Sequence, residues 1–149
     1  MTTSMSAKRL MNKQVLLDTN ILTYAIDEDS KYFEVVRGLL NDNSFEFCTT
    51  FKNLSEFLSV VTRAPNASMS VQDALQAVED FRSYLKILYP TEESLDLFVD
   101  LVRRYSPGGL KIHGHEIASI ALSNKIPLIA TLNKKDFAGI EEITLVPIG

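Results

Sequence analysis

Short apolar segments alternate with amphipathic segments along nearly the whole chain, and this alternation limits its fold more than any other feature. Five segments have the composition of buried strands, at 15–17, 45–49, 87–89, 126–130 and 144–147. Segments of helical character lie at 31–40, 53–61, 70–84, 92–105 and 113–124. Strands that alternate with helices form parallel sheets covered on both faces. We therefore predict an α/β fold, a single domain with a central parallel sheet and 144–147 as an edge strand.

Polar residues predict where several of these helices begin. Ser30, Asn53, Ser70 and Thr91 each precede a helical segment and are expected N-caps. With Asn53 as the cap, Glu56 falls in the first turn of its helix, where the helix dipole favours a carboxylate. Glu56 also has apolar neighbours, and a carboxylate among core residues near a strand end needs a partner. The helix boundaries therefore leave both a structural and a functional role open for Glu56.

Length and composition favour one compact domain. The chain has 149 residues, of which 46% are hydrophobic, enough for one core and too few for two. We expect residues 1–13 to form a flexible N-terminal extension and residues 14–149 to form the domain. No apolar run approaches the roughly 18 residues that a membrane span needs. The lone Cys48 lies in a strand-like segment, which predicts a buried, reduced thiol and a cytoplasmic protein.

The net charge of the chain limits the kinds of partner that it can bind. A net charge of -4 excludes a generic polyanion binder with a large basic patch. Contact with a nucleic acid would therefore be local, through a metal ion or a few placed cations. The candidate phosphate contacts are the basic residues Arg63, Lys111, Lys134 and Lys135. Solvated surface charge is the alternative role for these four side chains.

Acidic and amide side chains follow two of the predicted strands. Asp18 comes directly after 15–17, and Asn133 and Asp136 follow 126–130. In open α/β sheets ligands bind at the carboxyl ends of the strands, so these oxygens are expected at one place. A loop opener or cap is the structural alternative for each of them. Clustered carboxylates repel one another and raise their own pKa values, and Mg²⁺ held by a few carboxylates and water removes that penalty.

Four strings, in this order and spacing, resemble the PIN domain, in particular the VapC-type toxins of bacterial toxin–antitoxin pairs. They are Leu17-Asp18-Thr19-Asn20-Ile21, Leu54-Ser55-Glu56-Phe57, Ile112-His113 with Ile117-Ala118-Ser119, and Thr131-Leu132-Asn133-Lys134-Lys135-Asp136-Phe137. The resemblance implies a cytoplasmic endoribonuclease toxin that depends on Mg²⁺ or Mn²⁺ and cuts RNA. It also implies a homodimer silenced by a cognate antitoxin, which often threads a cationic side chain into the acidic pocket.

The resemblance assigns roles to residues of this chain. It implies that the metal is held by Asp18, Glu56 and Asp136. Asn133 competes with Asp136 for the fourth polar position of the catalytic set. The supporting positions are Thr19, Asn20, Thr131 and His113. Apolar positions on the helices that follow Ser30 and Ser70 are candidates for a dimer face.

One position departs from the family pattern. The family usually has an aspartate after an apolar residue and a histidine, and this chain has Gly114 after Ile112 and His113. Glycine removes a metal ligand and weakens the start of the helix, so catalysis is expected to be weakened. The alternative function is a non-catalytic PIN-like scaffold that binds an antitoxin, RNA or a second protomer.

Three explanations of Gly114 stay open. Another side chain compensates, the chain has decayed naturally to a binding module, or a host that carried the toxic gene selected an inactivating Asp-to-Gly change. Glu116 lies about 200° round the helix from position 114, so compensation is expected from His115 or from a shifted helix start. The same angle separates His113 from His115, which argues against a zinc site made by this pair.

Two other phosphate-handling folds do not fit the strings. A haloacid-dehalogenase phosphotransferase needs Asp-x-Asp after its first strand, and this chain has Asp18-Thr19-Asn20. A phospho-receiver domain needs an acceptor aspartate after a later strand, and the strand end at 47–50 has none.

Overall fold

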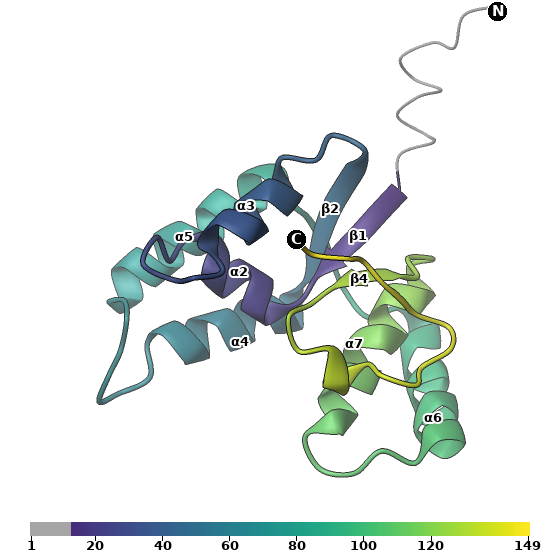
Figure 1. Ribbon diagram of the computed structural model, residues 1–149. Helices are drawn as coiled ribbons and strands as arrows, with labels where there is room; N and C mark the ends of the chain where they lie inside the picture. Colours follow the sequence, from purple (N-terminus) through teal and green to yellow (C-terminus); the bar gives the residue numbers. More distant parts are fainter. Residues whose placement is uncertain (1–12) are drawn as a thin grey trace, which may run out of the picture.

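The computed structural model describes residues 13–149, which form a parallel sheet with helices on both faces (Figure 1). The five strands are β1 (Lys13–Leu17), β2 (Phe45–Thr50), β3 (Lys86–Leu88), β4 (Leu128–Ala130) and β5 (Thr144–Leu145). Every pairing is parallel, and the order is β3-β2-β1-β4-β5. The predicted α/β fold is confirmed, and β5 is an edge strand as expected.

Within the described part of the chain, six α-helices and one short 3-10 helix connect the strands. They are α2 (Thr19–Ala25), α3 (Phe33–Leu40), α4 (Phe51–Val61), α5 (Val71–Tyr84), α6 (Glu92–Tyr105), α7 (Lys111–Ser123) and η1 (Lys134–Asp136). The predicted caps Ser70 and Thr91 are confirmed, because their hydroxyls accept hydrogen bonds from the backbone N–H groups of Asp73 and Glu93. No helix within residues 13–149 is long and apolar enough to cross a membrane.

The start of α4 differs from the prediction. Thr50 is the N-cap, and its hydroxyl accepts from the backbone N–H of Asn53. The predicted cap Asn53 is therefore wrong: it lies inside the helix with a fully buried side chain. Glu56 consequently lies in the second turn, too far from the N-terminus of α4 for the helix dipole to explain it. The prediction placed the cap three residues too late because Thr50 and Asn53 are both good N-cap residues.

Two other helix starts also differ, and one helix was not predicted. α3 begins after Tyr32 and not after Ser30, and α7 begins at Lys111, two residues before the expected start. The helix α2 was not predicted; Asp18 caps it by accepting from the backbone N–H of Thr19. Of the expected extension, residues 1–12 lie outside the described residues, and Lys13 is the first residue of β1.

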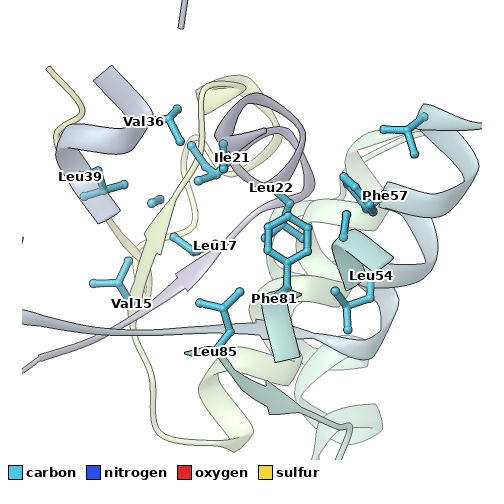
Figure 2. Close-up of a cluster of buried hydrophobic side chains, with 14 of the residues drawn as sticks. Val15, Leu17, Ile21, Leu22, Val36, Leu39, Leu54, Phe57, Phe81 and Leu85 are labelled. Carbon is cyan, nitrogen blue, oxygen red and sulfur yellow. The ribbon is translucent and has the colours of Figure 1, made fainter. Parts of the chain in front are cut away.

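Two apolar layers cover the two faces of the sheet. Alternate residues of β1 point to opposite sides, so Val15 and Leu17 belong to one layer and Leu16 to the other. Helices α2 to α5 pack on the first face, where Figure 2 shows this cluster, and α6 and α7 pack on the second. Cys48 is buried in the second layer as predicted, and burial raises the pKa of its thiol to about 12.

Candidate active site

The Asp18 carboxylate lies at the carboxyl end of the central strand β1 and is only 8% exposed. Two donors reach each of its oxygens. Oδ1 accepts from the Thr19 backbone N–H (2.9 Å) and the Asn53 amide (3.2 Å), and Oδ2 accepts from the Thr131 hydroxyl (2.8 Å) and the Asn20 amide (3.3 Å). A carboxylate has about four lone-pair sites, so these four bonds saturate it. The fold therefore holds this one carboxylate in a fixed orientation.

Burial and neighbouring charge set the proton affinity of Asp18. Burial raises the pKa of its carboxyl above the usual value, and the negative charges of Glu56 and Asp136 raise it further. The hydrogen bonds from Thr131 and Thr19 act in the opposite direction and lower that pKa. Glu56 and Asp136 therefore each lie close enough to Asp18 for their negative charges to act on its carboxyl.

Asn53 links Asp18 to the helix that carries Glu56. Its side-chain N–H groups donate to Asp18 Oδ1 and to the Thr19 hydroxyl (2.9 Å), and its oxygen accepts from the Thr50 hydroxyl (2.7 Å). The Thr19 hydroxyl then donates to Glu56 Oε2 (2.9 Å). This chain of hydrogen bonds joins β1, the end of β2 and α4, and it explains why Asn53 is fully buried.

The loop after β4 closes the other side of Asp18. The Thr131 hydroxyl, which donates to Asp18, accepts from the Asn20 amide (3.1 Å) and from the Asn133 backbone N–H (3.0 Å). The Asn133 side chain donates to Asp136 Oδ2 (2.8 Å). Asp136, and not Asn133, lines the small cavity of about 260 Å³ beside Asp18. The sequence left Asn133 and Asp136 as alternatives for the fourth polar position. In the structure Asp136 lines the cavity and Asn133 donates a hydrogen bond to it.

A lysine lies among the acidic groups on the α4 side. Lys52 Nζ is 2.9 Å from Glu116 Oε1 and 3.9 Å from Glu56 Oε1. Glu116 is also 4.0 Å from His113 Nδ1. The shared ammonium places Glu116 on the same side as Glu56, so α7 brings a carboxylate to this region two residues beyond Gly114. Of the two expected routes to compensation, His115 or a shifted helix start, the second agrees with α7, which begins at Lys111, two residues before the expected start.

His115 points away from these carboxylates. It is buried, its ring Nδ1 is 2.9 Å from the carbonyl oxygen of Lys111, and its ring centre is 6.1 Å from that of Tyr105 on α6. His113 is exposed at the rim, next to Glu116. The two histidines thus have different surroundings, one exposed and one buried, which agrees with their spacing of two residues on a helix.

Gly114 packs directly against η1. A Cβ atom at this position would lie 2.3 Å from the backbone oxygen of Asp136 and 3.0 Å from its carbonyl carbon. Real Cβ atoms essentially never approach backbone that closely, so a side chain here requires η1 to move. The space that an acid at position 114 would need is taken by the backbone that carries Asp136.

Most of the predicted site residues meet in one network. The hydrogen bonds connect seven of the eight: Asp18, Thr19, Asn20, Glu56, Thr131, Asn133 and Asp136. The eighth, His113, is not part of this network within residues 13–149 and lies next to Glu116. Sequence reasoning missed Asn53 and Lys52, although their spacing of three and four residues from Glu56 put all three on one face of a helix.

The oxygen-rich donor set suits a divalent cation of the Mg²⁺ type. Within residues 13–149, however, no three His, Cys, Asp or Glu side chains lie close enough to hold a metal ion as they stand. Mg²⁺ in proteins is commonly held by one or two carboxylates, with water and substrate phosphate completing its shell. Asp18 with Glu56 or Asp136 fits such a site. Of the four hydrogen bonds to Asp18, the 3.3 Å bond from Asn20 is the longest, and an ion would displace this one first.

A larger cavity of about 600 Å³ lies next to this site and shares Thr23 with it. Four aspartates line it: Asp27, Asp29, Asp73 and Asp80. None of the network residues lines this cavity. Its size alone therefore does not make it the functional centre, and its charge makes it a poor place for a phosphate.

The fold of the chain is similar to that of several solved structures. Three similar solved structures are VapBC2 from Rickettsia felis bound to a promoter DNA fragment, a toxin–antitoxin complex from Klebsiella pneumoniae, and VapC20 of Mycobacterium tuberculosis, a sarcin-ricin loop cleaving toxin. Their TM-scores are 0.68, 0.66 and 0.66 and their sequence identities 20%, 19% and 11%. The matches cover 89%, 89% and 87% of this chain and 97%, 96% and 98% of those chains.

At these identities the structural matches show the fold alone. No curated protein sequence matches the chain. The model of the PIN domain family matches residues 15–143, a range that includes every residue of the network. The chain belongs to the PIN domain family.

Proposed function

We propose that this protein is the toxin of a toxin–antitoxin pair, an endoribonuclease that uses a divalent cation. The observation that carries the proposal is the Asp18 carboxylate, held by four donors at the carboxyl edge of the sheet with Glu56 and Asp136 facing it. Two of the similar structures support it, one a toxin–antitoxin complex and one a sarcin-ricin loop cleaving toxin. PIN-domain nucleases generally use divalent metal ions, and the donor set here fits Mg²⁺ or Mn²⁺.

In this mechanism the side chains of the protein bind the ion and orient the carboxylates that hold it. Asp18 would hold the ion with Glu56 or Asp136, and Asn53, Thr19 and Thr131 keep those carboxylates in place. A bound ion lowers the pKa of its water and neutralises charge on the scissile phosphate. No covalent nucleophile is required.

The substrate in this proposal is single-stranded or looped RNA, whose backbone and splayed bases enter pockets that exclude a duplex. Lys134 and Lys135 are exposed on η1, the helix that carries Asp136, so they stand beside the site. The aspartates of the larger cavity repel phosphate on the side that shares Thr23 with the site. RNA is therefore expected to approach over η1. A cognate antitoxin, a homodimer and a cytoplasmic location complete the proposal.

Gly114 favours a second candidate, a PIN-like scaffold that binds RNA, an antitoxin or a second protomer without catalysis. α7 contributes no carboxylate at position 114, and η1 occupies the space where one would fit. The two candidates differ in one property: only the nuclease requires a metal-dependent reaction.

The test is cleavage of a structured RNA by the purified chain with Mg²⁺, Mn²⁺ or EDTA. The nuclease predicts cleavage with metal that EDTA abolishes and that Asp18→Asn lowers by at least about a hundredfold, as expected when a metal ligand is lost. Asp80→Asn, in the neighbouring acidic cavity, is the matched control and should cut like the wild type. RNA binding without cleavage under all conditions would leave the scaffold as the better account.

A further inference from the structure

The Lys52 ammonium reaches two of the acidic groups of the site, Glu56 and Glu116. Among residues 13–149, no other Lys or Arg nitrogen lies within 4.0 Å of the carboxylates of Asp18, Glu56, Glu116 or Asp136. The Lys52 side chain is 26% exposed, so the protein and not bulk water makes most of its surroundings. Four carboxylates against one ammonium leave an excess of negative charge that a single divalent ion largely neutralises.

The position of this ammonium matters as much as its charge. Lys52 lies on α4, which packs on one face of the sheet, and Glu116 lies on α7, which packs on the other. The ammonium between Glu56 and Glu116 therefore joins the two helices at the edge of the sheet where the strands end. It stands between the two carboxylates that an ion on this side of the site would use.

We propose that Lys52 is the fixed cation of this site: its ammonium takes the place between Glu56 and Glu116 that a second divalent ion would fill, so the chain holds one such ion, on the Asp18 side. The inference rests on the proposed function, because it concerns the metal ion of that same site.

Simple electrostatics supports the exclusion. An ammonium and a divalent ion only about 4 Å apart repel strongly at the effective dielectric constant near a protein surface. The lysine is attached to the chain, so its charge is present at every metal concentration, whereas an ion must compete for the place. The ammonium also holds Glu116, which lies two residues beyond Gly114 on α7, in an ion pair at 2.9 Å.

The inference is tested by titrating the metal-free protein with Mn²⁺, following free Mn²⁺ by electron paramagnetic resonance and heat by calorimetry. The wild type should bind one Mn²⁺. Lys52→Met keeps the unbranched side chain, one atom shorter, and removes its charge, so it should bind a second Mn²⁺ or bind the first at least about fivefold more tightly. Lys52→Arg keeps the charge and should behave like the wild type, as should Lys86→Met on the edge strand β3.

Each outcome decides the matter. Two ions on the wild type, or a Lys52→Met protein that matches Lys86→Met in both stoichiometry and affinity, would overturn the inference and leave the proposed metal site intact. No Mn²⁺ on any variant would overturn both. No Mn²⁺ on the wild type but binding by Lys52→Met would overturn the stated stoichiometry of one ion, and it would also contradict metal-dependent catalysis by the natural chain. Thermal unfolding of Lys52→Met and Lys52→Arg shows whether both are folded.

Discussion

Asn53 shows how one buried side chain can organise a site. Its amide supplies bonds to Asp18 and Thr19, and its oxygen accepts from Thr50. We predict that Asn53→Leu, which leaves these polar groups buried without partners, lowers the free energy of unfolding by about 1–3 kcal/mol. Urea unfolding measures it. Ser59→Ala, at an exposed position of the same helix, is the control and should change stability by less than about 0.5 kcal/mol. Equal effects would mean that the Asn53 bonds carry no net stability.

The raised pKa of Asp18 predicts a pH dependence of stability. Burial lifts that pKa in the folded chain above the ordinary value of 3.8, so the folded state binds the Asp18 proton more tightly than the unfolded state does. Stability from this group is present below pH 3.8 and is lost as the pH rises through the folded pKa. Asp18→Asn has no such proton. We predict that the free energy of unfolding of Asp18→Asn increases relative to that of the wild type as the pH rises through this window.

The measurement is urea unfolding in EDTA between pH 3.5 and 8. Asp42→Asn is the control of opposite sign, because hydrogen bonds from Ser44 lower the pKa of Asp42. The free energy of unfolding of this variant should therefore decrease relative to that of the wild type as the pH rises. A constant difference between Asp18→Asn and wild type across this range would contradict the raised pKa.

At the scale of elements, the contact between α7 and η1 predicts an unusual response at Gly114. We expect Gly114→Ala to lower the free energy of unfolding by about 1–3 kcal/mol, because the new methyl group meets the Asp136 backbone. Gly38→Ala in α3, where no atom lies within 4 Å of the new Cβ, is the matched control and should raise stability by about 0.5–1 kcal/mol. Thermal or urea unfolding of both variants measures the difference.

The same contact bears on Gly114→Asp. This change restores the family's acid but also forces η1, and with it Asp136, to move. We therefore expect Gly114→Asp to raise RNA cleavage by less than about tenfold, since a displacement of about 1 Å can cost a hundredfold in rate. A gain of a hundredfold or more would show that η1 adjusts easily and that the missing acid alone limits activity.

Element patterns were predicted better than their ends. The strands and the helices α5 and α6 follow from clear alternation and from the caps Ser70 and Thr91. The helix α2 escaped prediction because its seven residues follow β1 without a loop, and Asp18 caps it while also belonging to the site. Thr50 displaced Asn53 as the cap of α4 because the buried network needs the Asn53 side chain, and such a tertiary demand cannot be read from local propensity.

The candidate site was predictable to a similar extent. The edge of the sheet brings Asp18, Thr131 and Asp136 together, as the parallel-strand argument requires. The contact of Gly114 with η1 and the ion pair between Lys52 and Glu116 depend on how closely α7 approaches its neighbours. That distance is set by packing of the whole second apolar layer and has no local sequence signal.

At the scale of the whole molecule, metal binding should stabilise the fold, because only the folded chain brings Asp18, at the end of β1, close to Asp136, which follows β4. An ion at a hundred times its dissociation constant adds about 2.7 kcal/mol to the free energy of unfolding. We predict a gain of this size for the wild type in saturating Mn²⁺ and its loss in Asp18→Asn. Unfolding in Mn²⁺ and in EDTA measures both.

The neighbouring acidic cavity makes this comparison specific. Asp73 and Asp80 line a cavity more than twice as large as the one beside Asp18, and an ion attracted by negative charge alone would bind there as well. If the hydrogen-bonded carboxylates select the ion, Asp73→Asn with Asp80→Asn keeps the full stabilisation by Mn²⁺ and Asp18→Asn loses it. The reverse pattern would place the ion in the larger cavity and remove the physical basis for catalysis at the end of β1.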